Sequence, residues 1–282
     1  MNIPGRALLL LLSLLSGLAG CVNLSPDLRR DHADQLAAAS GWQRVRLPAG
    51  SFVLAGYLPQ TIPADNQTLT VYIEGDGLAW ITASLVSLDP TPLQPIGLAL
   101  ALRHPQGAAA YLARPCQYVE GVETRGCSAE YWTSKRFAPE VVAATSQAID
   151  TLKQRFQAQQ LVLVGYSGGG ALAALVAAHR QDVKLLVTVA GNLDHRAWTE
   201  QHHATPLTGS LNPADAWQEL LNVPQIHFVG GKDQVVGREV AAAYASRFPA
   251  DRRPKIQVVP EFDHTCCWAE QWPDLFRPGK TD

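Results

Sequence analysis

The sequence lacks an excess of charge of either sign. Its 282 residues carry 23 basic and 25 acidic side chains, which gives a formal net charge of -2 at pH 7. Nucleic-acid binding depends on clustered positive charge that meets the phosphates, so we expect no nucleic-acid partner. The sequence also lacks internal repeats and any CxxC pair of the kind that binds zinc. We therefore expect neither a metal nor a cofactor.

Long apolar runs are scarce as well. The one near the start, residues 7–15, follows Arg6 and precedes the small residues 16–20. A membrane-spanning helix needs roughly 20 apolar residues, so this run is too short to cross a bilayer comfortably. A positive residue, a short apolar run and small residues are instead typical of a secretion signal.

The end of that segment, Leu18-Ala19-Gly20-Cys21, resembles the lipobox of bacterial lipoproteins. The resemblance implies that residues 1–20 are a signal peptide and that Cys21 is acylated, for example with palmitate. Several acyl chains, at about 0.8 kcal/mol per buried CH₂, would hold the chain on a membrane. Val22 after the cysteine implies the outer membrane of a bacterial envelope, on its periplasmic or surface face. The alternative is an ordinary signal peptide with an incidental cysteine.

Four cysteines remain besides Cys21, and a secreted chain can oxidise them. Four cysteines allow three pairings. Cys116 and Cys127 are close enough in sequence to close a short loop, and we predict a disulfide between them. Cys266 and Cys267 are then either bridged to each other or free.

The part of the chain before residue 60 contains two different patterns. Residues 21–40 are polar and alanine-rich, which indicates a tether or a loose helix. Between residues 42 and 57 apolar and polar side chains roughly alternate, as in a β-hairpin at the edge of a sheet. We expect the folded domain to occupy residues 41–282.

From residue 68 onward, short apolar runs bounded by Gly or Pro alternate with helix-length stretches. This alternation predicts an α/β fold, a mostly parallel, doubly wound sheet flanked by helices, with its site at the carboxyl ends of the strands. We expect strands over residues 69–74, 108–113, 160–165, 183–190, 225–230 and 255–260. We expect helices over residues 139–157, 168–180 and 237–248.

One motif in this region carries chemistry. The apolar residues 161–164 run into Gly165-Tyr166-Ser167-Gly168-Gly169, and an alanine-rich stretch follows. This is the G-x-S-x-G nucleophile elbow between a strand and a helix. The turn strains the serine backbone, and side chains at Gly165 or Gly169 would collide with the neighbouring strand and helix. The alternative is a tight turn whose glycines serve packing or anion binding.

With this motif the chain resembles the α/β-hydrolase family over residues 68–272. In that family the nucleophile, an acid and a histidine follow in this order. Asp233 matches the acid and His264 the histidine, and the resemblance implies that His264 takes the proton of Ser167 while Asp233 orients the imidazole. Asp194, after the preceding strand, is the alternative acid.

The resemblance also implies an oxyanion hole. One donor would be the N–H of Gly168, and the other that of Asp76 in the sequence Glu74-Gly75-Asp76-Gly77, with Gly77 as the alternative. Because a carboxylate would repel an oxyanion, the Asp76 side chain should point away or be paired. Residues 114–118 depart from the family pattern and suggest no chemistry.

These features predict a serine hydrolase that cleaves small-molecule or lipid esters, with thioesterase, acyltransferase and peptidase activities as variants of the same triad. The alternative is a non-catalytic lipoprotein that uses the scaffold to bind a partner or the cell wall. Residues 192–222 are too few for a large lid, so we expect an open cleft. Trp80, Trp132 and Trp268 could line it, although core packing is the commoner role for any one of them.

Overall fold

A computed structural model describes residues 25–62 and 67–276. The predicted signal peptide and the predicted acylation site at Cys21 lie outside the described residues. Among the helices within these two ranges, none has the length and apolar character needed to cross a bilayer.

Eight strands form one sheet in the order β1-β2-β4-β3-β5-β6-β7-β8. The first three strands in this order pair antiparallel, and all the other neighbours pair parallel. The strands are β1 (Trp42–Ala49), β2 (Phe52–Pro59), β3 (Thr68–Ile73), β4 (Ala108–Leu112), β5 (Gln160–Tyr166), β6 (Val183–Val189), β7 (Gln225–Gly230) and β8 (Lys255–Val259). The predicted hairpin and the six predicted strands agree with these bounds to within two residues, which confirms the fold class.

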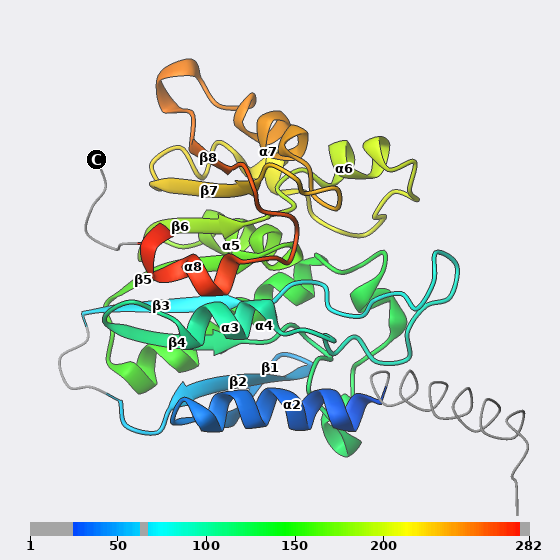
Figure 1. Ribbon diagram of the computed structural model, residues 1–282, viewed down its shortest axis with the longest axis vertical. Helices are drawn as coiled ribbons and strands as arrows, with labels where there is room; N and C mark the ends of the chain where they lie inside the picture. The colour runs from blue at the N-terminus through cyan, green and yellow to red at the C-terminus, as the bar shows by residue number, and fades with distance from the viewer. Residues whose placement is uncertain (1–24, 63–66, 277–282) are drawn as a thin grey trace, which may run out of the picture.

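Helices cover both faces of the sheet (Figure 1). On one face lie α2 (Pro26–Ala39), α3 (Ile96–Leu102) and α8 (Trp268–Leu275). On the other lie α4 (Pro139–Phe156), α5 (Gly168–Ala178) and α7 (Arg238–Ala245). The short α6 (His195–Gln201) and the 3-10 turns η1 (Gly121–Thr124), η2 (Ala129–Trp132), η3 (Pro213–Ala216) and η4 (Ala250–Arg252) lie in the connections. Each face of the sheet therefore has its own hydrophobic core.

The sequence explains how α4 and α5 pack. The apolar residues that share one face of α4, Val142, Ile149, Leu152 and Phe156, are all buried. Thr145 lies on the same face, and its hydroxyl donates a hydrogen bond of 2.8 Å to the carbonyl of Val141 four residues earlier. By contrast, α5 consists of small and apolar residues and is buried all the way round. A helix that is apolar on every side belongs in a core.

Most of the segment predicted to be a tether or a loose helix is a packed helix. Residues 26–39 form α2, and its Ala33 and Ala37 are fully buried against the sheet. Asp34 accepts a hydrogen bond of 2.7 Å from the hydroxyl of Tyr57 in β2. The folded part of the chain therefore begins before residue 41, because alanine at every fourth position lets the helix lie close to the strands.

Two disulfides are present in the described residues. Cys116 is bonded to Cys127, the predicted pair. Cys266 is bonded to Cys267, which is the bridged one of the two states that the sequence left open.

Candidate active site

Ser167 lies in the tight turn between β5 and α5. Its φ of 52° and ψ of -121° place a non-glycine residue in a region that is strained for an L side chain. A Cβ at Gly165 would overlap the carbonyl oxygen of Gly169, and one at Gly169 would overlap that of Ile73. The glycines are thus required for the steric reason expected from the motif. Gly168 is the first residue of α5, where a backbone N–H has no partner within the helix.

Three residues far apart in sequence meet at the end of β5. His264 Nε2 lies 3.0 Å from Ser167 Oγ, and His264 Nδ1 lies 2.8 Å from Asp233 Oδ2. A carboxylate only accepts, so Nδ1 carries the proton and Nε2 accepts from the serine hydroxyl. Asp233 is fully buried, and its other oxygen accepts from the amides of Val235 and Val236, both at 2.8 Å. The turn and the imidazole therefore use different oxygens of one carboxylate.

Asp194, the alternative acid, has a different place. Its Oδ1 accepts hydrogen bonds from the amides of Arg196 and Ala197 at 3.1 and 3.3 Å, and from Asn212 Nδ2 at 2.9 Å. These contacts make it the N-cap of α6. Asp233, and not Asp194, contacts the histidine.

The histidines near Asp194 differ from one another. His202 and His203 are exposed. His195 is buried instead, and its ring stacks on Phe137 with centroids 6.1 Å apart. Burial lowers the pKa of His195, which favours its neutral form.

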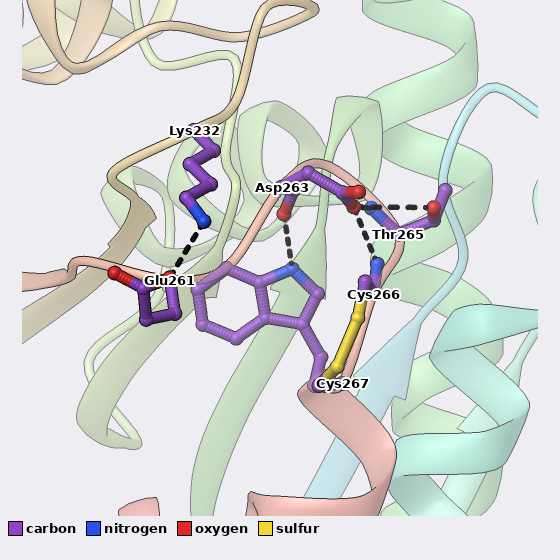
Figure 2. Close-up of a disulfide and its surroundings, with 7 residues drawn as sticks. Lys232, Glu261, Asp263, Thr265, Cys266 and Cys267 are labelled. Atoms are coloured by element: carbon purple, nitrogen blue, oxygen red, sulfur yellow. Dashed lines mark hydrogen bonds and ion pairs between the residues drawn. A yellow bond between two sulfur atoms is a disulfide. The ribbon is translucent and has the colours of Figure 1, made fainter.

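The loop that carries His264 is held by its neighbours in sequence (Figure 2). The carboxylate of Asp263 accepts from the amides of Thr265 and Cys266, at 2.8 and 2.6 Å. Its backbone carbonyl accepts from Trp268 Nε1 at 3.0 Å. The amides of Cys266 and Thr265 lower the pKa of the Asp263 carboxyl, so it remains an anion that can keep both bonds.

A contact from the last residue of β5 fixes the same loop. The hydroxyl of Tyr166 donates to the carbonyl of His264 at 3.0 Å, and the two rings lie 5.3 Å apart. Burial raises the pKa of Tyr166, so the phenol keeps the proton that it donates. Tyr166 precedes the serine directly, which ties the histidine loop to the nucleophile turn.

The Asp76 side chain is paired, which is one of the two outcomes expected for it. Arg114 and Arg136 both form ion pairs with Asp76, and both guanidinium groups are buried. Burial by itself would raise the pKa of the Asp76 carboxyl, but the charges of Arg136 and Arg114 outweigh it and lower the pKa. A Cβ at Gly168 would overlap the Asp76 carboxylate, so the loop and the serine turn are in contact.

Residues 114–118, for which the sequence suggests no chemistry, hold this loop. Gln117 Nε2 donates to the carbonyl of Gly75 at 2.9 Å, while Gln117 Oε1 accepts from the amide of Arg114 at 3.1 Å. The sequence alone predicts no role at the site for Arg114, Gln117 or Arg136. Arg114 comes just after β4 and Asp76 just after β3, and the two side chains meet because these strands are neighbours in the sheet.

Glu74 anchors the other end of the loop. Its buried carboxylate accepts from the amides of Gly75 and Gly97, at 2.9 and 3.0 Å, and from the hydroxyl of Tyr111 at 3.0 Å. Burial raises the pKa of Glu74, although these donors favour the charged form. Residues 74–77 are thus held at the carboxylate of Glu74, at the carbonyl of Gly75 and at the carboxylate of Asp76.

A cavity of about 400 Å³ lies at the serine. Its lining includes Ser167, His264, residues 74–78, Leu93 and Val235. A second cavity of about 520 Å³ is lined by Trp80, Trp198 and Arg136, among others. The two cavities are neighbours, because Trp198 Nε1 donates to the carbonyl of Val235 at 2.7 Å and Arg136 is bonded to Asp76.

Of the three tryptophans singled out in the sequence, only Trp80 is exposed, and Trp132 and Trp268 are buried. The connection over residues 192–222 contains α6 and η3 and no lid domain. Nowhere in residues 25–62 and 67–276 do three or more His, Cys, Asp or Glu side chains gather in a way that could hold a metal ion.

Comparison with known proteins places this geometry in context. The sequence model of the family described as "Serine hydrolase (FSH1)" matches residues 109–260, which is more than half of the chain. A search of the curated proteins gives no match. The matched residues include the serine turn and the Asp233 turn.

Solved structures share the fold. An esterase of Pyrococcus furiosus superposes with a TM-score of 0.57 at 11% identity, over 83% of this chain and 89% of that one. Est1E from Butyrivibrio proteoclasticus gives 0.56 at 13% identity, over 82% and 95%. An α/β serine hydrolase without lid from Xanthomonas campestris gives 0.51 at 11% identity, over 83% and 89%. At these identities the likeness is one of fold.

Proposed function

The chain belongs to the serine hydrolase (FSH1) family, and from that premise we propose that it hydrolyses carboxylic esters through an acyl-enzyme on Ser167. The observation that supports this proposal is the series of hydrogen bonds from Asp233 through His264 to Ser167, at 2.8 and 3.0 Å. Such a series lets a hydroxyl lose its proton at neutral pH as it attacks a carbonyl.

In the first half of the reaction, Ser167 Oγ attacks the ester carbon and its proton passes to His264 Nε2. The resulting imidazolium is stabilised by the buried carboxylate of Asp233. The tetrahedral intermediate then collapses, the bond to the alkoxide breaks, and the imidazolium returns the proton to the leaving alcohol. In the second half, water attacks the acyl-enzyme with His264 again as the base, and the acid leaves.

The negative charge on the intermediate needs donors that are already in place. We propose the backbone N–H of Gly168 and that of Asp76, with Gly77 as the alternative to Asp76. The two arginines on the Asp76 carboxylate support this assignment in two ways. They hold the loop against the serine turn, and they replace a repelling negative charge by a local net positive one.

Hydrolysis of an ester series of graded acyl length tests the proposal, with Ser167→Ala as the blank. We expect the substitution to lower kcat by at least about 10⁴-fold. A fluorophosphonate probe should label the wild-type chain and not Ser167→Ala. Wild-type hydrolysis equal to the blank, without labelling, would favour the non-catalytic alternative.

The same triad can act on thioesters and amides or transfer acyl groups to alcohols. Thioester and anilide analogues of the best ester, and an added acceptor alcohol, would rank these activities by kcat/KM. We expect the anilide to rank below the ester, because no gating domain of the kind that would mark a peptidase covers the cavity in the described residues.

We also propose that the chain is tethered to a bacterial membrane, most specifically the outer membrane, through acylated Cys21. The support comes from Leu18-Ala19-Gly20-Cys21 and Val22 alone. Metabolic labelling with an alkyne analogue of palmitate tests it. Labelled wild type in the membrane fraction and unlabelled Cys21→Ser would agree with the tether, whereas equal labelling of both would exclude this cysteine.

A further inference from the structure

Residues 77–88, which we term the apolar loop, contain no charged residue and expose large apolar side chains. Trp80 is 42% exposed, Leu85 is 56% exposed and Leu88 is 98% exposed. Single exposed apolar residues are ordinary, but a cluster in one uncharged segment marks an interaction surface.

The apolar loop is ordered by its own backbone. The amide of Ile81 donates to the carbonyl of Leu85 at 2.8 Å, and that of Ser87 to the carbonyl of Ala79 at 3.0 Å. Trp132 Nε1 donates to the carbonyl of Ser87 at 3.0 Å and ties the loop to the core. Backbone groups that are bonded within the protein lose less when a segment moves toward the apolar part of a bilayer, where no water can bond them. The loop therefore presents its apolar side chains without leaving these polar groups unpaired.

The start of the folded chain lies beside this loop. Arg29 Nη1 in the first turns of α2 donates to the carbonyls of Asp89 and Thr91, and the charges of Arg29 and Arg30 pair with the Asp89 carboxylate at 3.6 and 3.7 Å. Leu28, on the same turn, is exposed. Figure 1 shows the first turn of α2 and the residues just after β3 on the same side of the molecule, toward which the β3 arrow points.

The length of chain before α2 limits where a membrane could lie. Cys21 precedes Ser25 by four residues, which span at most about 14 Å when fully extended. If Cys21 is acylated, the bilayer surface lies within that distance of the start of α2, on the side of the apolar loop.

We propose that the apolar loop docks on the surface of a lipid bilayer and turns the mouth of the catalytic cavity toward it. The loop follows residues 74–76 directly, Leu78 lines the cavity at Ser167, and Trp80 lines the second cavity. Esters carried in the membrane are then the substrate class that reaches the site most directly. Which cellular membrane the loop meets depends on the proposed tether, and the substrate class depends on the proposed hydrolysis. The docking of the loop on a bilayer depends on neither.

The absence of charge in the apolar loop indicates the lipid. Basic segments bind anionic headgroups through electrostatic attraction that salt screens. An uncharged loop gains from burial of Trp and Leu side chains at the interface instead. Docking should therefore occur on zwitterionic phosphatidylcholine and vary less than twofold between 0.05 and 0.5 M NaCl.

Co-sedimentation with phosphatidylcholine vesicles tests the docking in a chain of residues 22–282, which keeps every described element and lacks the acylation site. We expect the double variant Leu85→Ser and Leu88→Ser to weaken the vesicle partition coefficient at least tenfold. Val258→Ser should change it less than twofold, because Val258 is similarly exposed at 46% but lies in the edge strand β8, four strands away from β3 in the sheet. Equal thermal midpoints would verify that both variants fold.

Three results would overturn the proposal. The first is a vesicle partition coefficient that is the same for wild type and the double variant, and the second is no binding of wild type at millimolar lipid. The third is that neither protein binds vesicles, while sedimentation velocity finds wild type as a dimer and the double variant as a monomer. The last result would assign the surface to a second copy of the chain. Ser167→Ala should sediment with vesicles as wild type does, so a failure of the esterase proposal would be visible separately.

Discussion

Two ion clusters at opposite ends of the strands show how position decides what a similar set of charges does. At the carboxyl ends of the strands, Asp76 is held by the buried Arg114 and Arg136 beside the serine turn. At the amino ends, Asp182 accepts from Arg180 at 2.8 Å and from Lys153 at 2.5 Å just before β6. Both carboxyls have lowered pKa values. The first cluster supports the proposed chemistry, and the second supports only the fold.

The largest expected effect comes from the carboxylate that contacts the histidine itself. Asp233→Asn should lower kcat by about 10⁴-fold, since an amide no longer fixes the tautomer that accepts the serine proton. Asp194→Asn is the matched control, because Asp194 also lies at the carboxyl ends of the strands but caps a helix. It should leave kcat within about threefold of the wild-type value. Steady-state kinetics on one ester decides, and a larger loss with Asp194→Asn would reverse the assignment of the acid.

Arg136→Gln tests whether the Asp76 cluster matters for chemistry. The substitution leaves the Asp76 charge half paired beside the proposed oxyanion site, and we expect kcat to fall by about 10²-fold with KM little changed. Arg180→Gln makes the same exchange in the cluster at the amino ends and should change kcat less than about threefold. Equal effects of the two substitutions would remove the distinction between the clusters.

The bridge from Cys116 to Cys127 tests whether the support of the site is also support of the fold. Serine at both positions should lower the free energy of unfolding by about 3 kcal/mol, which is the chain-entropy value for a loop of this size. Urea unfolding measures the loss. Because Arg114 and Gln117 flank Cys116, we also expect the double serine variant to have a lower kcat than wild type at urea concentrations where both remain folded. An unchanged kcat would show that residues 74–77 keep their place without the disulfide.

The smallest expected effect lies in the cluster at the amino ends. Arg180 and Lys153 outweigh burial and lower the pKa of Asp182 to about 2, so its ionised form stabilises the fold above the ordinary carboxyl pKa. That contribution is lost as pH falls through about 2. Asp182→Asn should lower the thermal midpoint by about 2 °C at pH 6, because a partly exposed pair is screened by solvent. The difference from wild type should shrink between pH 4 and pH 2, and a constant difference would contradict this account.

The sequence predicted one half of the site much better than the other. Ser167 sits in a local motif, and Asp233 and His264 each follow a recognisable strand at the positions implied by the resemblance to the α/β-hydrolase family. The pairing of Asp76 with Arg114 and Arg136 depends on the neighbours of β3 in the sheet and on a side chain 60 residues away. Strand order is a tertiary property that apolar periodicity does not encode, so these partners were not predicted.

The same limit explains the difference at the N-terminal segment. Residues 26–39 are polar and alanine-rich, and their composition alone resembles a linker. They become a helix of the domain because Ala33 and Ala37 fit closely against the sheet and Tyr57 reaches Asp34. Local composition left a tether and a loose helix open, and long-range packing decides for the helix.

The central claim is that Ser167 becomes acylated, and intact-mass spectrometry during the first turnover of a p-nitrophenyl ester tests it directly. We predict that the chain gains the mass of one acyl group, that digestion places it on the peptide containing Ser167, and that His264→Ala slows its appearance by at least about 10³-fold. An ester consumed with no covalent species, or an acyl group on another residue, would contradict the account.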